Sequence, residues 1–193
     1  HLGQALSLYH NVGDKEGEAL ILANIGYVYY NVGENEKALA HYDQALTLYQ
    51  SLGNSTGEAS TFTKIANTYF ARGEWQQALE YYTQALPLYQ AVGDKTGEAN
   101  TLNSIADSYS VLGDMQKAVE FMSDVVEIYH STGDSRSEAI TRSRIAVLQY
   151  QLKDFDAAAK SLEIAIDLAT EINDPMLPAF SALLDEINAQ RNQ

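Results

Sequence analysis

The sequence predicts an all-α fold, a right-handed α-solenoid (superhelix) of helix-turn-helix hairpins with about ten helices. The first observation is a period of forty residues, because the same short connector recurs along the chain. Its glycines are Gly13, Gly53, Gly93 and Gly133, and Asn173 occupies the equivalent position forty residues after Gly133. The second observation is that each unit between connectors holds two amphipathic helical patterns. A fixed period of about 20 to 50 residues is typical of repeat proteins, whose units stack on their neighbours.

We expect a single array over residues 1–193. The segment from His1 to Tyr9 aligns with His41 to Tyr49, so the chain opens within a second helix. At the other end Asp185 and Glu186 occupy positions that are apolar in earlier units, as expected of a cap. The expected boundaries are a half repeat at 1–12, full repeats at 13–52, 53–92, 93–132 and 133–172, and a C-terminal capping helix at 173–193.

Both helices of each unit carry an apolar face with the spacing of three and four residues that indicates a helix. Small residues alternate with large ones, so the two helices of a hairpin can approach closely. The first-helix face is Leu22, Ile25 and Tyr29, then Phe62, Ile65 and Tyr69, then Leu102, Ile105 and Tyr109. The second-helix face is Ala38, Tyr42, Ala45 and Tyr49, repeated as Ala78, Tyr82, Ala85 and Tyr89.

The connectors have the residues of helix ends. Glycine suits the left-handed position after a helix, and Asp or Asn follows it as an N-cap. Asp174 followed by Pro175 predicts a last helix that begins at Pro175 and runs to Asn192, because proline is favoured at the first helical position. Pro87 lies inside a helical pattern, where we expect a bend. The alternative is a helix that ends near Leu86.

Composition narrows the class of partner. The chain has 12 basic and 26 acidic residues, for a net charge of −14, which disfavours nucleic acid and anionic membranes. It has no cysteine and no apolar run long enough for a membrane span, so we expect a cytoplasmic protein or a piece of a longer one. No catalytic motif is present, and the paired positions of His10 and His130 indicate surface repeat residues. We therefore expect no enzyme, no cofactor and no metal site.

The units share a pattern, which in the first full unit consists of Leu22, Ile25, Gly26, Tyr29, Gly33, Ala38, Tyr42 and Ala45. This pattern resembles the tetratricopeptide repeat. The forty-residue form is similar to repeats of kinesin light chains, Leu-Gly-Asn repeat proteins and bacterial, especially cyanobacterial, repeat proteins. The resemblance implies a non-catalytic scaffold that binds a peptide or protein segment in a concave groove lined by first helices. The alternative is a regulatory or sensor module of a larger protein, such as a caspase-like protease or a transcription regulator.

The candidate site consists of first-helix residues that the packing of the repeat does not need. Within a strict repeat, positions that vary from unit to unit are free of packing. Asparagine can donate to and accept from a peptide backbone, and Lys64 and Arg144 are cations in an acidic protein. The alternative is an ordinary solvated surface. The candidates are Asn24, Tyr27, Lys64, Asn67, Phe70, Asn100, Asn103, Asp107, Arg144 and Tyr150.

Two further expectations concern partners. The two-carboxylate clamp of some family members is incomplete here, although Lys64, Asn67, Asn103 and Arg144 have similar chemistry. At the N-terminal end the apolar residues Ala5, Leu6 and Tyr9 lack a first helix of their own, so we expect weak self-association there.

Overall fold

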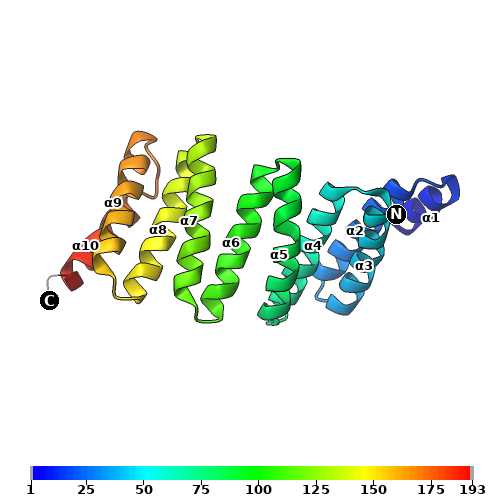
Figure 1. Cartoon of the computed structure of the whole chain (residues 1–193), viewed down its shortest axis with the longest axis horizontal. Coiled ribbons are helices and arrows are strands. Elements are labelled where there is room, and N and C mark those ends of the chain that lie inside the picture. Colours follow the sequence, from blue (N-terminus) through cyan, green and yellow to red (C-terminus); the bar gives the residue numbers. More distant parts are fainter. Residues whose placement is uncertain (1, 192–193) are drawn as a thin grey trace. The chain divides into compact units, whose positions relative to one another are not determined.

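The computed structural model describes residues 2–191, which are all-α and form ten helices joined by short connectors (Figure 1). The predicted fold class and helix number are thereby confirmed, with the helices packed in chain order as hairpins. His1, Asn192 and Gln193 lie outside the described residues. The helices are α1 (Leu2–Val12), α2 (Lys15–Asn31), α3 (Asn35–Leu52), α4 (Ser55–Ala71), α5 (Trp75–Val92), α6 (Lys95–Val111), α7 (Met115–Thr132), α8 (Ser135–Gln151), α9 (Phe155–Glu171) and α10 (Leu177–Arg191).

The chain divides into two compact units, residues 1–101 and 102–193. In the first unit α2 packs on α3 and α4 packs on α5. In the second unit α8 packs on both α7 and α9, and α9 also packs on α10. The division into one array with the repeat boundaries given above stays a prediction, as does the handedness of the solenoid.

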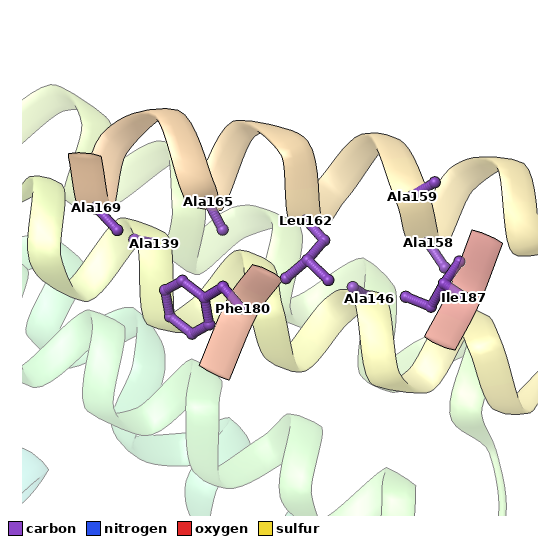
Figure 2. Packing of buried hydrophobic residues seen from close by; sticks show 9 residues of the cluster. All are labelled: Ala139, Ala146, Ala158, Ala159, Leu162, Ala165, Ala169, Phe180 and Ile187. Carbon is purple, nitrogen blue, oxygen red and sulfur yellow. The ribbon is translucent and has the colours of Figure 1, made fainter. Parts of the chain in front are cut away.

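The core of each unit combines small and large side chains. Ala38, Tyr42 and Ile65 form one cluster in the first unit, and all three are almost completely buried. In the second unit Leu162 of α9 lies between Phe180 and Ile187 of α10, with alanines of α8 and α9 around them (Figure 2). These are the apolar faces that the helical spacing predicts.

The connectors have the predicted caps. Asp14 accepts a hydrogen bond from the Gly17 amide at 2.9 Å, and Asp94 and Asp134 accept equivalent bonds from the residues three positions later. The glycines at helix ends have positive φ. Lys153 (φ 63°) in the fourth repeat and Asn173 (φ 52°) directly after it take the same left-handed conformation without glycine.

The predicted start of the last helix is wrong by two residues. The carboxylate of Asp174 accepts a hydrogen bond from the Met176 amide at 2.8 Å, and the Asp174 carbonyl accepts one from the Leu177 amide at 3.1 Å. These bonds form a turn over Pro175 and Met176, so α10 begins at Leu177.

Pro87 does not end its helix. The helix α5 is continuous from Trp75 to Val92, so the alternative of an end near Leu86 is wrong. A bend at Pro87 stays a prediction.

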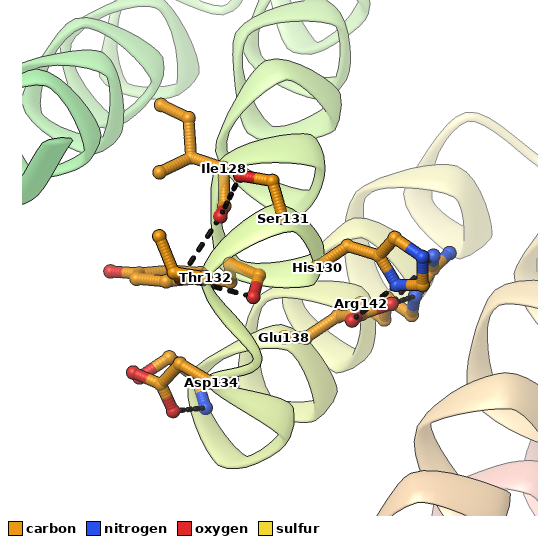
Figure 3. A network of polar contacts seen from close by, with 9 residues as sticks. Ile128, His130, Ser131, Thr132, Asp134, Glu138 and Arg142 are labelled. Carbon is orange, nitrogen blue, oxygen red and sulfur yellow. Dashed lines mark hydrogen bonds and ion pairs between the residues drawn. The ribbon is translucent and has the colours of Figure 1, made fainter.

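The fourth repeat replaces an apolar packing residue by Arg142 and compensates with charge. Arg142 pairs with Glu138 at 2.8 Å, and His130 Nδ1 lies 3.1 Å from the other oxygen of the same carboxylate (Figure 3). His10 and Glu18 form the same contact at 3.2 Å at the first connector. Both histidines are mostly exposed and act as links across a connector.

A glycine in the first turn of three helices allows a tyrosine from the preceding helix to lie against the backbone. A Cβ atom built on Gly57 would lie 2.3 Å from the ring of Tyr49, and the pairs Gly17 with Tyr9 and Gly97 with Tyr89 are equivalent. In the fourth repeat Ser137 stands at this position, and Tyr129 is only half-buried.

We therefore expect Gly57→Ala to lower the free energy of unfolding, by roughly 1–3 kcal/mol, the usual cost of overpacking. Alanine is the better helix former, so a stabilised variant would contradict the close contact with Tyr49. The matched control is Ser137→Ala, which should change stability by less than about 0.5 kcal/mol because a Cβ is already accommodated there. Urea unfolding followed by circular dichroism measures both.

Candidate functional site

A pocket of about 270 Å³ opens in the first unit beside the first helices α2 and α4. We call it the tyrosine pocket. It brings together three of the predicted site residues, Tyr27, Lys64 and Asn67. Its lining residues are Tyr27, Tyr30, Tyr42, Ser60, Thr63, Lys64, Asn67 and Tyr89.

The helix register explains why these side chains meet. Ser60, Lys64 and Asn67 are spaced by four and three residues, so they share one face of α4. On α2 the residues Tyr27 and Tyr30 are three apart, and their rings stack with centroids 6.4 Å apart. The pocket therefore lies beside the apolar stripes that hold the helices together.

Lys64 is the electrostatic centre of the pocket. Its ammonium group donates a hydrogen bond to Ser60 Oγ at 2.6 Å. Burial lowers the pKa of Lys64 from its ordinary value. Three basic residues between positions 2 and 191 are half-buried, and two of them, Arg142 and Arg144, pair with carboxylates. Over the same residues no carboxylate forms an ion pair with Lys64.

The rest of the pocket is neutral. Burial raises the pKa values of Tyr42 and Tyr89, so both phenols keep their protons near pH 7. Thr63 Oγ1 lies 3.4 Å from the Tyr89 hydroxyl. The buried Tyr82 donates a hydrogen bond to Asn67 Oδ1 at 2.5 Å, which holds the amide in place. The pocket thus offers aromatic rings, neutral hydrogen-bonding groups and one cation.

A second group of predicted residues meets in the second unit. The Arg144 guanidinium of α8 donates a hydrogen bond to Asn103 Oδ1 of α6 at 2.8 Å. It also forms an ion pair with Asp107 of α6. The charge of Arg144 is therefore already balanced by the protein itself.

The remaining predicted residues do not line the tyrosine pocket. Asn24 and Asn100 are exposed and Phe70 is half-buried. The ring of Tyr150 packs edge-on against Phe155 with centroids 5.5 Å apart, and its hydroxyl lies 3.5 Å from Glu186.

The ten predicted site residues do not include five of the lining residues, namely Tyr30, Tyr42, Ser60, Thr63 and Tyr89. Ser60 was detectable, since it lies one helical turn before Lys64. Tyr42 and Tyr89 belong to the packing face, and their contribution to the pocket follows only from the structure.

Two features are absent from residues 2–191. None of the helices there has the length and apolar content to cross a membrane. In the same range no cluster of three or more His, Asp or Glu side chains is placed to hold a metal ion.

The family model described as "Tetratricopeptide repeat" matches the chain twice, over residues 17–91 and 97–171. The two matches together cover most of the sequence. A comparison with curated proteins finds no significant relative.

Several solved structures have the same fold. BtubC (BKLC) from P. vanneervenii aligns with a TM-score of 0.72 and 17% identity, over 99% of this chain and 89% of that one. A putative kinesin light chain of Podosopora anserina with nearly identical TPR-like repeats aligns with a TM-score of 0.72 and 18% identity, over 89% and 86%. A STAND protein with a tetratricopeptide repeat sensor from Pyrococcus horikoshii aligns with a TM-score of 0.73 and 17% identity, over 91% of this chain but 26% of that one.

The burial of Lys64 predicts a pH-dependent stability. Below the lowered pKa of the folded protein the ammonium of Lys64 is charged in both states, and the folded state bears the cost of its poor hydration. Between the lowered pKa of the folded protein and the ordinary value of 10.5, the unfolded chain binds a proton that the folded protein has lost. Stability conferred by this residue therefore rises with pH across that window.

We expect Lys64→Met to be at least as stable as the wild type at pH 7, and its advantage to shrink as pH rises towards 10.5. Urea unfolding at several pH values measures the difference in the free energy of unfolding between the variant and the wild type. Groups that titrate alike in both proteins cancel in this difference. Lys160→Met, at an exposed lysine, is the control and should show no such trend. An advantage independent of pH would contradict the desolvation of Lys64.

Proposed function

The chain belongs to the tetratricopeptide repeat family, and on that premise we propose that it is a non-catalytic scaffold that binds a segment of another protein on its first helices. The observation that carries this proposal is the tyrosine pocket, whose lining includes residues of the first helices α2 and α4. Aromatic rings and asparagine amides there can hold both the side chains and the backbone of an extended segment.

The charge of Lys64 in the tyrosine pocket favours a partner segment with acidic character at this site. The protein as a whole has a net charge of −14, so an acidic partner gains nothing from long-range attraction. Lys64 nevertheless has no carboxylate partner among residues 2–191. An acidic group that reaches the pocket would pair with it at short range. In the second unit Asn103, Asp107 and Arg144 form a contact surface of mixed charge, which suits neutral or mixed segments.

A regulatory or sensor role within a larger protein is the second candidate. The observation that favours it is the alignment with the STAND protein, where the matched repeats make up 26% of that chain. The open reading frame around this sequence tests the idea. A neighbouring effector domain would support it, and a reading frame limited to the array would refute it.

The partner-binding proposal predicts that Lys64→Glu weakens binding without unfolding the array, because Lys64 lies outside the packing face. The partner is first captured by pull-down and identified by mass spectrometry, and its affinity is then measured by calorimetry. We expect a loss of about tenfold or more for Lys64→Glu, and weaker binding of the wild type at high salt, where charges are screened.

Two variants control this experiment. Lys160→Glu makes the same charge change on an exposed part of α9 and should bind like the wild type. Arg144→Gln removes the second cation and leaves Asp107 without its partner, so it tests the surface of the second unit. Unchanged affinity of folded Lys64→Glu and Arg144→Gln would place the binding surface elsewhere.

Self-association through α1 is a separate prediction. Ala5, Leu6 and Tyr9 are half-buried in the structure, whereas Leu8 and Val12 of the same helix are 62% and 68% exposed. We expect a weak, concentration-dependent dimer that Leu8→Lys disrupts. Sedimentation or light scattering measures it, and a monomer at all concentrations would refute it.

A further inference from the structure

We propose that the tyrosine pocket is a receptor for one carboxylate carried on an aromatic ring or a similar flat apolar group, with Lys64 as its counter-charge. The proposal rests on the proposed function, because it names the chemical group that the partner presents to this site.

The second unit shows how the array balances a cation on a first helix. Arg144 pairs with Asp107, which lies 37 residues earlier on the preceding first helix. The residue 37 positions before Lys64 is Tyr27. The repeat therefore supplies a carboxylate to Arg144 at the position where it supplies a phenol to Lys64.

This difference leaves an unmatched charge. The phenol of Tyr27 cannot balance an ammonium group, and the only hydrogen bond of the Lys64 side chain within residues 2–191 goes to the neutral Ser60 hydroxyl. A half-buried ammonium that lacks a carboxylate is unfavourable, and an anion that enters the pocket removes that cost. A ligand carboxylate at Lys64 would take the role that Asp107 takes at Arg144.

The charge of the ligand follows from the charged groups that line the pocket. The pocket contains a single cation, which matches a monoanion. A phosphate monoester carries a charge of about −1.5 to −2 at pH 7 and is commonly held by clustered arginines. Inside a protein with a net charge of −14, one lysine would leave part of that charge unbalanced. A carboxylate is the anion that fits.

The shape and the walls indicate what carries the carboxylate. At about 270 Å³ the pocket lies just below the usual range of about 300–1,000 Å³ for small-molecule sites, so it suits a group of about one side chain. Tyr27, which is 52% exposed, and the stacked Tyr30 offer ring faces to an incoming group. Aromatic rings pair favourably in offset or edge-on arrangements. Ser60 and Asn67 are the neutral groups available to the second carboxylate oxygen, because Asn67 uses Oδ1 to accept from Tyr82 and its NH₂ group can donate.

Two sources could present this chemistry, a C-terminal aromatic residue or an acidic side chain beside an apolar one. Three probes test separately what the carboxylate and the ring contribute. N-acetyl-phenylalanine carries a terminal carboxylate next to a ring, N-acetyl-phenylalanine amide has the ring alone, and N-acetyl-glutamate amide has a side-chain carboxylate without a ring. Each is titrated into the whole 193-residue chain, with amide chemical shifts recorded by NMR.

We expect N-acetyl-phenylalanine to bind with shifts confined to the pocket, including the amides of Thr63 and Asn67. Its affinity should exceed that of the neutral amide by about tenfold, and Lys64→Met should abolish this preference, in line with the loss of one charge-assisted hydrogen bond. Binding of N-acetyl-glutamate amide with equal affinity would overturn the need for a ring. Equal affinity for the acid and the neutral amide would overturn the need for a carboxylate.

A substitution at Tyr27 tests the register argument directly. Tyr27→Asp places a carboxylate at the position that Asp107 has relative to Arg144, so it should occupy Lys64 and lower the affinity for N-acetyl-phenylalanine by about tenfold. Tyr27→Asn removes the same ring without adding charge and should retain the preference for the acid over the amide. Both variants should fold, since Tyr27 is half exposed. Equal binding by the two variants would overturn the proposal.

The outcomes are distinguishable from those for the proposed function. If a protein partner is captured but N-acetyl-phenylalanine causes no shifts in the pocket, the inference fails and the scaffold function stands. If the probe binds as expected but no protein partner is retained, the pocket chemistry stands and the scaffold function fails.

Discussion

The close approach of the two helices in each hairpin is the constraint on which the rest of the structure depends. At Gly26 an added Cβ would lie 2.6 Å from the ring of Tyr42 and 3.1 Å from the carbonyl oxygen of Ala38. Only a very small residue fits there, and Ala66, Ala106 and Ala146 take this position in later repeats with no exposed surface. Because the small residues settle the packing, neighbouring positions on the first helices are left to vary and can line a pocket.

The two cations on first helices show how one repeat geometry can give different surfaces. Arg144 pairs with a carboxylate of the preceding first helix, whereas the corresponding position before Lys64 holds a phenol, although both cations have the same place in the forty-residue register. The residue 37 positions earlier decides whether the cation has a carboxylate partner within residues 2–191. The repeats therefore differ in their surface charge at positions that the hairpins do not need for packing.

Much of the fold could be predicted from the sequence because packing repeats every forty residues, so that each unit independently indicates the same helices. The start of α10 could not, because a side-chain turn at Asp174 replaces the cap geometry of the other connectors. Part of the site could also be predicted, since Tyr27, Lys64 and Asn67 vary where packing residues do not. Tyr42 and Tyr89 were assigned to the core, and which edge of a core side chain reaches a pocket depends on helix positions in space.

The left-handed residue at each connector has a consequence for how such a chain can change in length. Lys153 and Asn173 adopt the left-handed conformation that glycine has at the other connectors, so this conformation does not depend on glycine. Up to Asp154 every helix therefore leaves its connector in an equivalent way, whereas the connector at Asp174 forms a turn of its own. Gene duplication or deletion of one forty-residue segment would join equivalent ends, and the surface formed by the first helices could grow or shrink by whole hairpins without a new connector having to evolve.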